Sequence, residues 1–335
     1  MNTIKTAAFA AVAAMSVTGA AQAEEASYVL ATASTGGTYY PVGVALSTLV
    51  KVKLEPEEKI GMSAISSAGS GENVRLLREN EAQFAIMQGL FGSYAATGTG
   101  PISESGPQEN LRSVTMLWQN VEQFLVSADA AGDGTVAALA DLKGKAMAMG
   151  AQNSGTIGSN RTLLEGLGVN IEEDYELVFG GYGPSVEALQ NAQVMGVGIP
   201  AGVPTGAISQ LMASAGDSVT PLEVTDEQMA TMDGGRDLWT RYVIPAGTYP
   251  GQEADWNTIA QPNFLATNAD VSEENVYLIT KTIFENLPFL QAIHPATKAM
   301  ALDKAIAGLP VPLHPGAARY YQEQGVEIPE RLMAK

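Results

Sequence analysis

The sequence predicts an α/β protein of two domains, and three observations support this prediction. Short apolar strands run repeatedly into glycine turns and then into amphipathic helices, first near residue 28 and again from residue 145. Strands that alternate with helices are typical of a parallel sheet with helices on its faces. The chain of 335 residues is also longer than a single hydrophobic core usually serves.

Residues 1–23 are predicted to be a secretory signal peptide. Lys5 precedes an apolar run over residues 7–20, and Ala21-Gln22-Ala23 supplies small residues for a cleavage site. We expect cleavage after Ala23 and export to a bacterial periplasm. Because the chain contains no cysteine, the exported protein would carry no disulfide and no thiol site.

The composition excludes some partners and says little about others. The formal net charge is -18, and loss of Lys5 with the signal peptide gives -18 - 1 = -19. Nucleic acid and anionic lipid are poor partners for such an acidic surface. The overall charge does not identify a ligand, because local donors in a pocket can differ in sign from the distant field. We expect a monomer without a cofactor.

The stretch over residues 31–50 contains the first strand, turn and helix. Apolar residues alternate up to Ala33, the turn Ser34-Thr35-Gly36-Gly37-Thr38 follows, and apolar residues then recur at helical spacing. Pro41 suits a first helical turn, where its missing N–H costs nothing. A glycine turn that opens a helix leaves backbone N–H groups unpaired at the positive end of the helix dipole. Such a turn attracts an anion.

The same order of elements returns along the chain. The expected strands after the first are 59–66, 83–88, 111–118, 121–128, 145–149, 175–179, 194–199 and 263–267. Helices are expected over residues 73–80 and 276–293 and around Arg319. Another is expected to end at Gly166 and Gly168, one to start at Pro184, and one to follow Gly202-Val203-Pro204. Thr225–Gln228 and Asp270–Glu273 match the capping box and predict helix starts.

The domain boundaries follow from two predicted crossings of the chain. The loop 97–110 and the two strands after it carry the chain out of the first domain, and the strand 263–267 returns it, antiparallel to 121–128. We therefore place residues 24–120 and 261–335 in lobe I and residues 121–260 in lobe II.

Three turns are the candidate binding elements. Gly36-Gly37-Thr38, Gly69-Ser70-Gly71 and Ser154-Gly155-Thr156 each follow a strand, precede a helix and carry hydroxyl groups. If all three helix starts face one cleft, their N–H and O–H donors would hold a carboxylate. The turns lack the Gly-Lys-Ser/Thr of a P-loop and the G-x-G-x-x-G spacing of a dinucleotide site.

Several neighbouring side chains have two interpretations. Asn73 and Gln88 could present an amide to the cleft or satisfy a local hydrogen bond. One of Tyr39 and Tyr40 could face the ligand while the other packs in the core. Three arginines lie near the turns but inside helices, so a surface ion pair is favoured over ligand contact; they are Arg75, Arg78 and Arg161.

The sequence gives an enzyme little support. The only histidines, His294 and His314, precede prolines near the C-terminus, and we expect structural roles for them. Without a cysteine, an H-E-x-x-H motif or a histidine near a serine elbow, neither a transition-metal site nor a nucleophilic triad is indicated.

Several separated motifs cover nearly the whole mature chain: Ser34–Pro41, Ala68–Asn73 with the following Arg-Leu-Leu, Asp141–Lys145, Ser154–Thr156, Ala201–Pro204, Gly247–Gln252, Asn275–Tyr277 and His314–Tyr321. In this order they resemble the TAXI solute receptors of tripartite ATP-independent periplasmic (TRAP) transporters. Asn153 departs from the glycine common in such receptors, and Gln193-Val194 departs from a common Asp-Ala.

The resemblance implies a type II periplasmic-binding-protein fold, with two α/β lobes joined by a hinge and a ligand cleft between them. It also implies a non-catalytic receptor that delivers a small organic acid, glutamate or a C5 dicarboxylate such as 2-oxoglutarate or 2-hydroxyglutarate, to TRAP membrane permease subunits. The candidate ligand-binding residues are Thr35, Gly36, Gly37, Thr38, Tyr39, Tyr40, Gly69, Ser70, Asn73, Gln88, Ser154, Gly155, Thr156, Gly202, Val203 and Pro204.

Three alternatives stay open at this point. The ligand could be another amino acid or a monocarboxylate. The protein could also be a periplasmic enzyme on the same fold, which would convert its ligand, or a sensory protein that signals to a membrane kinase.

Overall fold

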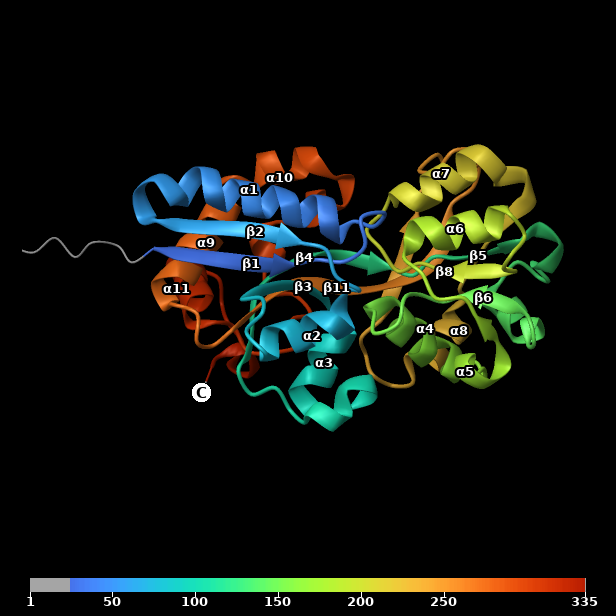
Figure 1. The fold of residues 1–335 in the computed structure, drawn as a ribbon, viewed down its shortest axis with the longest axis horizontal. Coiled ribbons are helices and arrows are strands. Elements are labelled where there is room, and N and C mark those ends of the chain that lie inside the picture. Colours follow the sequence, from blue (N-terminus) through green and yellow to red (C-terminus); the bar gives the residue numbers. More distant parts are fainter. Residues whose placement is uncertain (1–24, 335) are drawn as a thin grey trace, which may run out of the picture.

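A computed structural model describes residues 25–334 and divides them between two lobes (Figure 1). The predicted signal peptide lies outside the described residues. Within residues 25–334, no helix is both long enough and apolar enough to cross a membrane.

Most strands of a six-stranded mixed sheet lie in lobe I. The strands of this sheet are β1 (Ala26–Ala31), β2 (Ile60–Ile65), β3 (Phe84–Gln88), β4 (Leu111–Val121), β10 (Thr240–Ile244) and β11 (Trp256–Asn268). β1 is parallel to β2 and β3, whereas β11 is antiparallel to β3, β4 and β10. Within this sheet the expected parallel arrangement is therefore correct for the first three strands only, and in lobe II it is correct for the pairs that join residues 146–148 to residues 176–177 and 196–198.

The helices of lobe I cover both faces of its sheet (Figure 1). They are α1 (Tyr39–Glu58), α2 (Ser70–Arg78), α3 (Gly89–Thr97), α9 (Glu273–Glu285), α10 (Leu287–Ile293) and α11 (Pro315–Glu323). α1 begins directly after the predicted glycine turn and buries Val42, Leu46 and Val50. The single helix expected over 276–293 is two helices, because Pro288 cannot donate an N–H to the preceding turn and instead lies in the first turn of α10.

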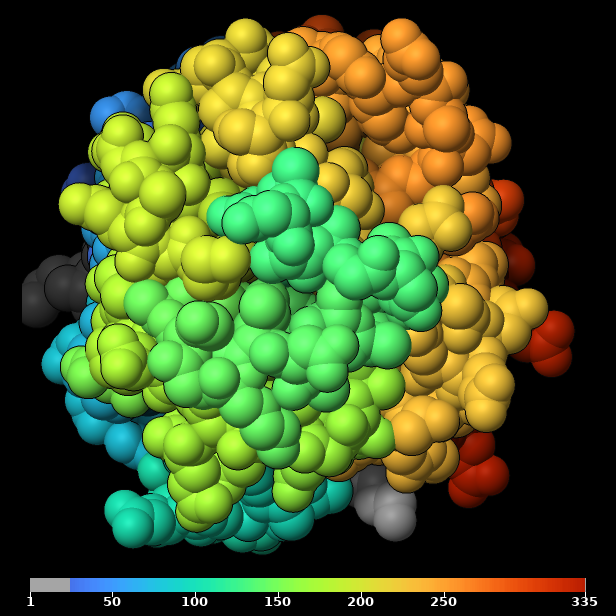
Figure 2. Space-filling model, turned by 90° about the vertical axis from the view of Figure 1, so that its right-hand side faces the viewer, coloured from blue at the N-terminus to red at the C-terminus, as the bar shows by residue number. Residues whose placement is uncertain are grey.

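Lobe II contains a five-stranded sheet in the order β7-β6-β8-β5-β9. Its strands are β5 (Phe124–Ser127), β6 (Ala146–Ala148), β7 (Glu176–Leu177), β8 (Gly196–Gly198) and β9 (Val219–Leu222). Its helices are α4 (Gly155–Gly166), α5 (Ile171–Asp174), α6 (Tyr182–Gln190), α7 (Gly206–Ala215) and α8 (Asp226–Asp233). Figure 2 views the molecule from the end formed by lobe II, where these green to yellow segments face the reader.

Two long antiparallel strands, β4 and β11, connect the lobes. Asn263 pairs with Trp118, and Ala260 pairs with Val121. The prediction that residues 263–267 pair with 121–128 is therefore wrong. β11 has 13 residues, and its second half pairs with β4 inside lobe I while its first half reaches Val121.

Capping side chains start the later helices as the sequence suggests, with one shift. Thr225 forms a full capping box with Gln228 at the start of α8. Before α9, the cap is Ser272, which accepts from the N–H of Asn275, so the helix begins two residues later than a cap at Asp270 would place it.

The hydrophobic cores of the lobes meet at α3. Leu90 of this lobe I helix belongs to the same buried cluster as Phe124, Trp239 and Ile259 of lobe II. α3 therefore packs across the boundary between the lobes, beside the strands that connect them.

Candidate ligand-binding cleft

A cavity of about 210 Å³ lies between the lobes. It is lined by Ala33, Ser34, Gly37, Thr38, Tyr39, Ser67, Ala68, Gly69, Ser70, Gln88, Ala151, Ser154, Gly155, Thr156, Gly180, Gly181, Tyr182, Pro200 and Ala201. Both lobes contribute to this wall, and none of the described residues that line it carries a charged side chain.

Four helices begin at the cavity wall, α1 and α2 from lobe I and α4 and α6 from lobe II. Among the hydrogen bonds of residues 25–334, none uses the backbone N–H of Ser70, Gly155 or Thr156. The N-cap Ser154 accepts from the N–H of Ile157 at 3.1 Å. Unpaired N–H groups and helix dipoles therefore give this uncharged cavity a positive potential.

Hydroxyl and amide groups add directional donors and acceptors. Ser70 Oγ accepts from the N–H of Gln88 at 3.0 Å, and Gln88 Oε1 is buried without a partner among the described residues. The hydroxyl groups of Tyr182 and Thr156 lie 3.0 Å apart. Tyr39 donates its hydroxyl hydrogen to Asn263 Oδ1.

Both tyrosines of the cavity are neutral phenols. Burial raises the pKa of Tyr39 well above its usual value. Burial likewise raises the pKa of Tyr182, an effect that the hydrogen bond with Thr156 only partly opposes. Each neutral phenol donates its single hydrogen within the protein, Tyr39 to Asn263 Oδ1 and Tyr182 to Pro200 O, so the unpaired N–H groups of the helix starts remain the donors for an anion.

The two lobes touch along a set of glycines that we call the glycine seam: Gly36, Gly71, Gly155 and Gly158. A Cβ atom at Gly36 would lie 3.2 Å from the nitrogen of Gly183, and one at Gly71 would lie 2.3 Å from Asn153 O. The N–H of Glu72 donates across the same boundary to Asn153 O at 2.9 Å. The structure therefore holds the lobes in a closed arrangement.

The sequence-predicted site residues divide into two groups. Nine line the cavity: Gly37, Thr38, Tyr39, Gly69, Ser70, Gln88, Ser154, Gly155 and Thr156. Seven lie outside its wall: Thr35, Gly36, Tyr40, Asn73, Gly202, Val203 and Pro204. The first group comes from all three predicted turns.

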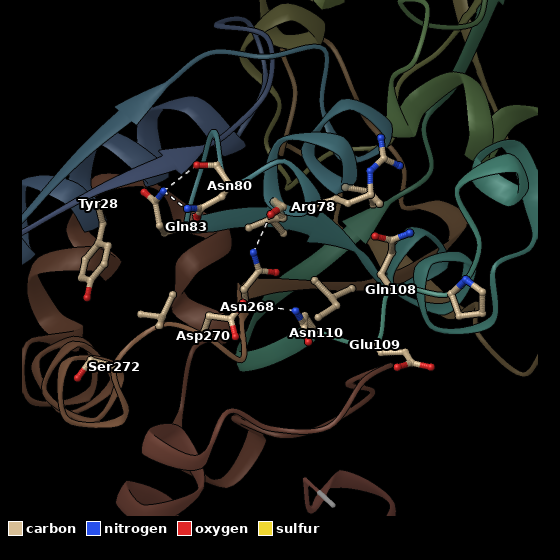
Figure 3. Close-up of a pocket in the computed structure, with 15 residues that line it drawn as sticks. Tyr28, Arg78, Asn80, Gln83, Gln108, Glu109, Asn110, Asn268, Asp270 and Ser272 are labelled. Carbon is tan, nitrogen blue, oxygen red and sulfur yellow. Dashed lines mark hydrogen bonds between the residues drawn. The ribbon is translucent and has the colours of Figure 1, made fainter.

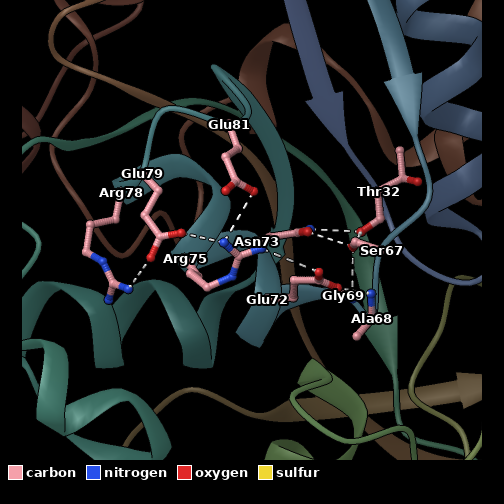
Figure 4. Close-up of polar contacts among 10 residues, drawn as sticks. All are labelled: Thr32, Ser67, Ala68, Gly69, Glu72, Asn73, Arg75, Arg78, Glu79 and Glu81. Atoms are coloured by element: carbon pink, nitrogen blue, oxygen red, sulfur yellow. Dashed lines mark hydrogen bonds and ion pairs between the residues drawn. The ribbon is translucent and has the colours of Figure 1, made fainter.

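Local packing explains the second group. Asn73 is fully buried and donates to Thr32 O at 2.8 Å (Figure 4). It also donates to Ile86 O at 2.9 Å. Thr35 is exposed, and Tyr40 is only half-buried. Gly202 supplies a carbonyl that accepts from Thr38 Oγ1 at 3.1 Å, so it supports the wall from behind.

Sequence reasoning missed several lining residues, and a signal existed for some of them. Gly180, Gly181 and Tyr182 follow a strand and open α6, which is the same pattern that identified the other three turns. Ser67 also lies in the predicted turn between β2 and α2, whereas Pro200 carries no comparable signal, because it lines the cavity through the tertiary fold.

The three arginines near the turns form ion pairs at the surface and do not line the cavity. Arg75 pairs with Glu81 at 3.2 Å and with Glu79, and Arg78 pairs with Glu79 at 2.9 Å (Figure 4). Arg161 pairs with Glu172. All three face an outer depression of about 750 Å³ between α2 and α4.

Replacing Arg161 with glutamine should change ligand affinity by less than about fivefold, because an exposed ion pair contributes about 1 kcal/mol or less. The same holds for Arg75→Gln. Calorimetric titration of each variant measures the effect. A loss of a hundredfold or more would show that an arginine holds the ligand after all.

Both histidines have structural partners. His314 is buried, with Nε2 3.0 Å from Val271 O, while Nδ1 accepts from the N–H of Gly316 and caps α11. His294 Nδ1 accepts from the N–H of Ala296. Burial lowers the pKa of both rings. Residues 25–334 contain no cluster of three or more potential metal-binding side chains.

A separate depression of about 580 Å³ lies on lobe I, away from the cleft (Figure 3). Its polar side chains are engaged with one another and with the backbone. Gln83 Nε2 donates to Asn80 at 3.1 Å, Asn268 Nδ2 donates to Leu77 O at 2.7 Å, and Asn110 Nδ2 donates to Asp270 at 3.4 Å. Because lobe II contributes nothing to this depression, lobe closure cannot trap a ligand there.

Comparison with known proteins gives one family and a set of similar folds. Residues 30–325 match the NMT1-like family. PhnD1 of Prochlorococcus marinus, solved in complex with methylphosphonate, is 12% identical, with 90% of this chain and 99% of that one covered and a TM-score of 0.54.

Two further solved structures are similar. A protein of Bordetella bronchiseptica is 13% identical, with 92% of this chain and 91% of that one covered and a TM-score of 0.52. A binding protein component of a phosphonate transporter from Pseudomonas aeruginosa is 7% identical, with 81% and 78% covered and a TM-score of 0.50. At such identities these structures show a shared two-lobed fold, and they do not identify the ligand of this chain.

Proposed function

The chain belongs to the NMT1-like family, the family of TAXI-type solute receptors, and we propose that its cleft captures a C5 dicarboxylate or glutamate for a TRAP membrane permease. The observation that carries this proposal is the convergence of four helix starts on one cavity without charged side chains. We further propose that the receptor works in the periplasm as a monomer, after removal of residues 1–23.

Closure of the lobes provides the capture mechanism. The helix starts of α1 and α2 lie on one lobe, and those of α4 and α6 lie on the other. Only the closed arrangement brings both sets of donors to one anion, so an anionic ligand stabilises the closed form. β4 and β11 connect the lobes and are the proposed hinge.

The uncharged wall favours dicarboxylates over amino acids. An ammonium group that is buried in the closed cleft needs an anionic partner, and no carboxylate lines the cavity. We therefore expect 2-oxoglutarate and 2-hydroxyglutarate to bind more tightly than glutamate, and monocarboxylates to bind more weakly than dicarboxylates of the same length.

Calorimetric titration of the purified mature protein against these compounds tests the proposal. Saturable binding of a dicarboxylate with the expected order would support it, and the ligand should be recovered unchanged after long incubation. Glutamate as the tightest ligand would contradict the order of preference. Absence of saturable binding by every organic acid and amino acid would contradict the function itself.

A further inference from the structure

Glu122 is a fully buried carboxylic acid at the point where the chain passes between the lobes. It lies between the end of β4 and the start of β5, and its N–H donates to Ile259 O at 2.9 Å. The proposed capture mechanism makes no use of this side chain. The capture mechanism therefore does not explain why a carboxyl group is buried at the proposed hinge.

The hydrogen bonds of Glu122 leave half of its carboxyl group unpaired. Ser159 donates to Oε1 at 2.7 Å, and Trp239 Nε1 donates to the same oxygen at 2.9 Å. Gln261 Nε2 lies 3.3 Å from it. Oε2 is buried and has no partner among the described residues. A protonated acid would place its hydrogen on this oxygen.

Among the described residues, no cation compensates a negative charge at this position. Within residues 25–334, no lysine, arginine or histidine forms an ion pair or hydrogen bond with Glu122. Burial without a counter-charge disfavours the ionised form and raises the pKa of Glu122 to about 7, although its three donors act in the opposite direction.

The other titratable groups that face this site are neutral or negative. Tyr39 of α1 and Tyr182 of α6 lie close enough for the charge of Glu122 to raise the pKa of each phenol. Asp233 at the end of α8 accepts from the N–H groups of Leu238 and Trp239. Burial opposes the ionised form of Asp233, but backbone donors outweigh this effect and lower its pKa.

In the closed arrangement of this structure, α3 of lobe I packs against the side chains around Glu122, which is fully buried. Leu90 of lobe I packs in one buried cluster with Trp239 and donates its N–H to Gln261 Oε1 at 2.9 Å. Two of the three donors to Glu122 are therefore held against α3. Ser159, the third donor, follows Gly158 of the glycine seam, which contacts Phe91 of α3. Separation of the lobes would remove this cover and admit water.

We propose that Glu122 takes up a proton when the lobes close on an anionic ligand, so that the receptor binds its ligand together with a proton. The open form keeps the carboxylate hydrated and ionised, and closure removes that water while it brings a second negative charge to the cleft. Both effects favour the neutral acid. This inference rests on the proposed function, because it needs an anionic ligand that closes the lobes.

The sign of the pH dependence follows directly. A group whose pKa is higher in the closed form than in the open form strengthens binding as the pH falls. If the open form has the ordinary value of 4.5 and the closed form a value of about 7, affinity should rise about tenfold from pH 8 to pH 6. The ligand carboxylates stay ionised over this window.

Calorimetric titration in two buffers of different ionisation enthalpy counts the protons. With the tightest-binding dicarboxylate, the wild-type protein should take up about half a proton per ligand at pH 7 and less at pH 8. Glu122→Gln imitates the neutral acid in size and should bind with no uptake and little pH dependence. Glu187→Gln, which changes an exposed carboxylate of α6, should behave as the wild type.

The outcomes distinguish the proposed role of Glu122 from the proposed receptor function. Binding without proton uptake in the wild type, or uptake that persists in Glu122→Gln, would overturn the role of Glu122 and leave the receptor function intact. Absence of binding by every compound at every pH would remove both. Uptake that disappears only in Glu122→Gln would establish the linkage.

Discussion

Replacing Gly155 with alanine should weaken ligand binding by about a hundredfold or more, since overpacking of this kind costs about 3 kcal/mol. The new Cβ atom would lie 2.6 Å from Gln88 Oε1 and 2.8 Å from Ser70 Oγ, inside the cavity and across the boundary between the lobes. It would take ligand space and keep the lobes apart. Calorimetric titration measures the loss.

The fold of the Gly155→Ala variant should survive, because the residue is the first of α4 and alanine suits a helix. Thermal unfolding followed by circular dichroism checks this. Gly183→Ala is the matched control, since it also adds a methyl group near the start of a lobe II helix but meets no atom within 4 Å. Wild-type affinity in Gly155→Ala would show that the turn is only a structural joint.

Gly158→Ala should weaken binding by about tenfold without adding an atom to the cavity wall, because it destabilises the closed form by about 1–2 kcal/mol. Its Cβ atom would lie 2.5 Å from Cζ of Phe91, a residue of the opposite lobe. The free protein in solution should also be more extended. Calorimetry and small-angle X-ray scattering measure these two effects.

A second substitution makes the Gly158 experiment specific. Phe91→Leu shortens the opposing side chain, so the double variant Gly158→Ala/Phe91→Leu should bind better than Gly158→Ala alone. Such coupling is expected only between groups in contact. Additive losses in the double variant would contradict a closing contact between α3 and α4.

The candidate cleft was predictable where it is built from local patterns. Glycine turns between a strand and a helix identified Gly37, Ser70 and Gly155 without any knowledge of the fold, because helix starts present N–H groups wherever they occur. The same rule reaches Gly181 and Tyr182. It cannot reach Pro200, whose position depends on how the two lobes meet.

The parts of the fold that were not predicted depend on distant partners. β9 contains Pro221, a residue that is unfavourable in strands, and it is a strand because it pairs with β5. Tertiary pairing of this kind overrides local propensity. The amide of Asn73 has the two acceptors that only the folded sheet supplies, Thr32 O and Ile86 O. Glu122 gave no sequence signal, since its chemistry comes from burial.

The path of β11 constrains the order in which this chain can fold as it emerges N-terminus first. β3 lies in lobe I between β1 and β11, and β11 emerges only after nearly all of lobe II. The sheet of lobe II, by contrast, is complete at β9. The N-terminal half of lobe I therefore emerges with one edge of its sheet unpaired. β11 pairs with β3 at that edge last, and this pairing completes the sheet of lobe I.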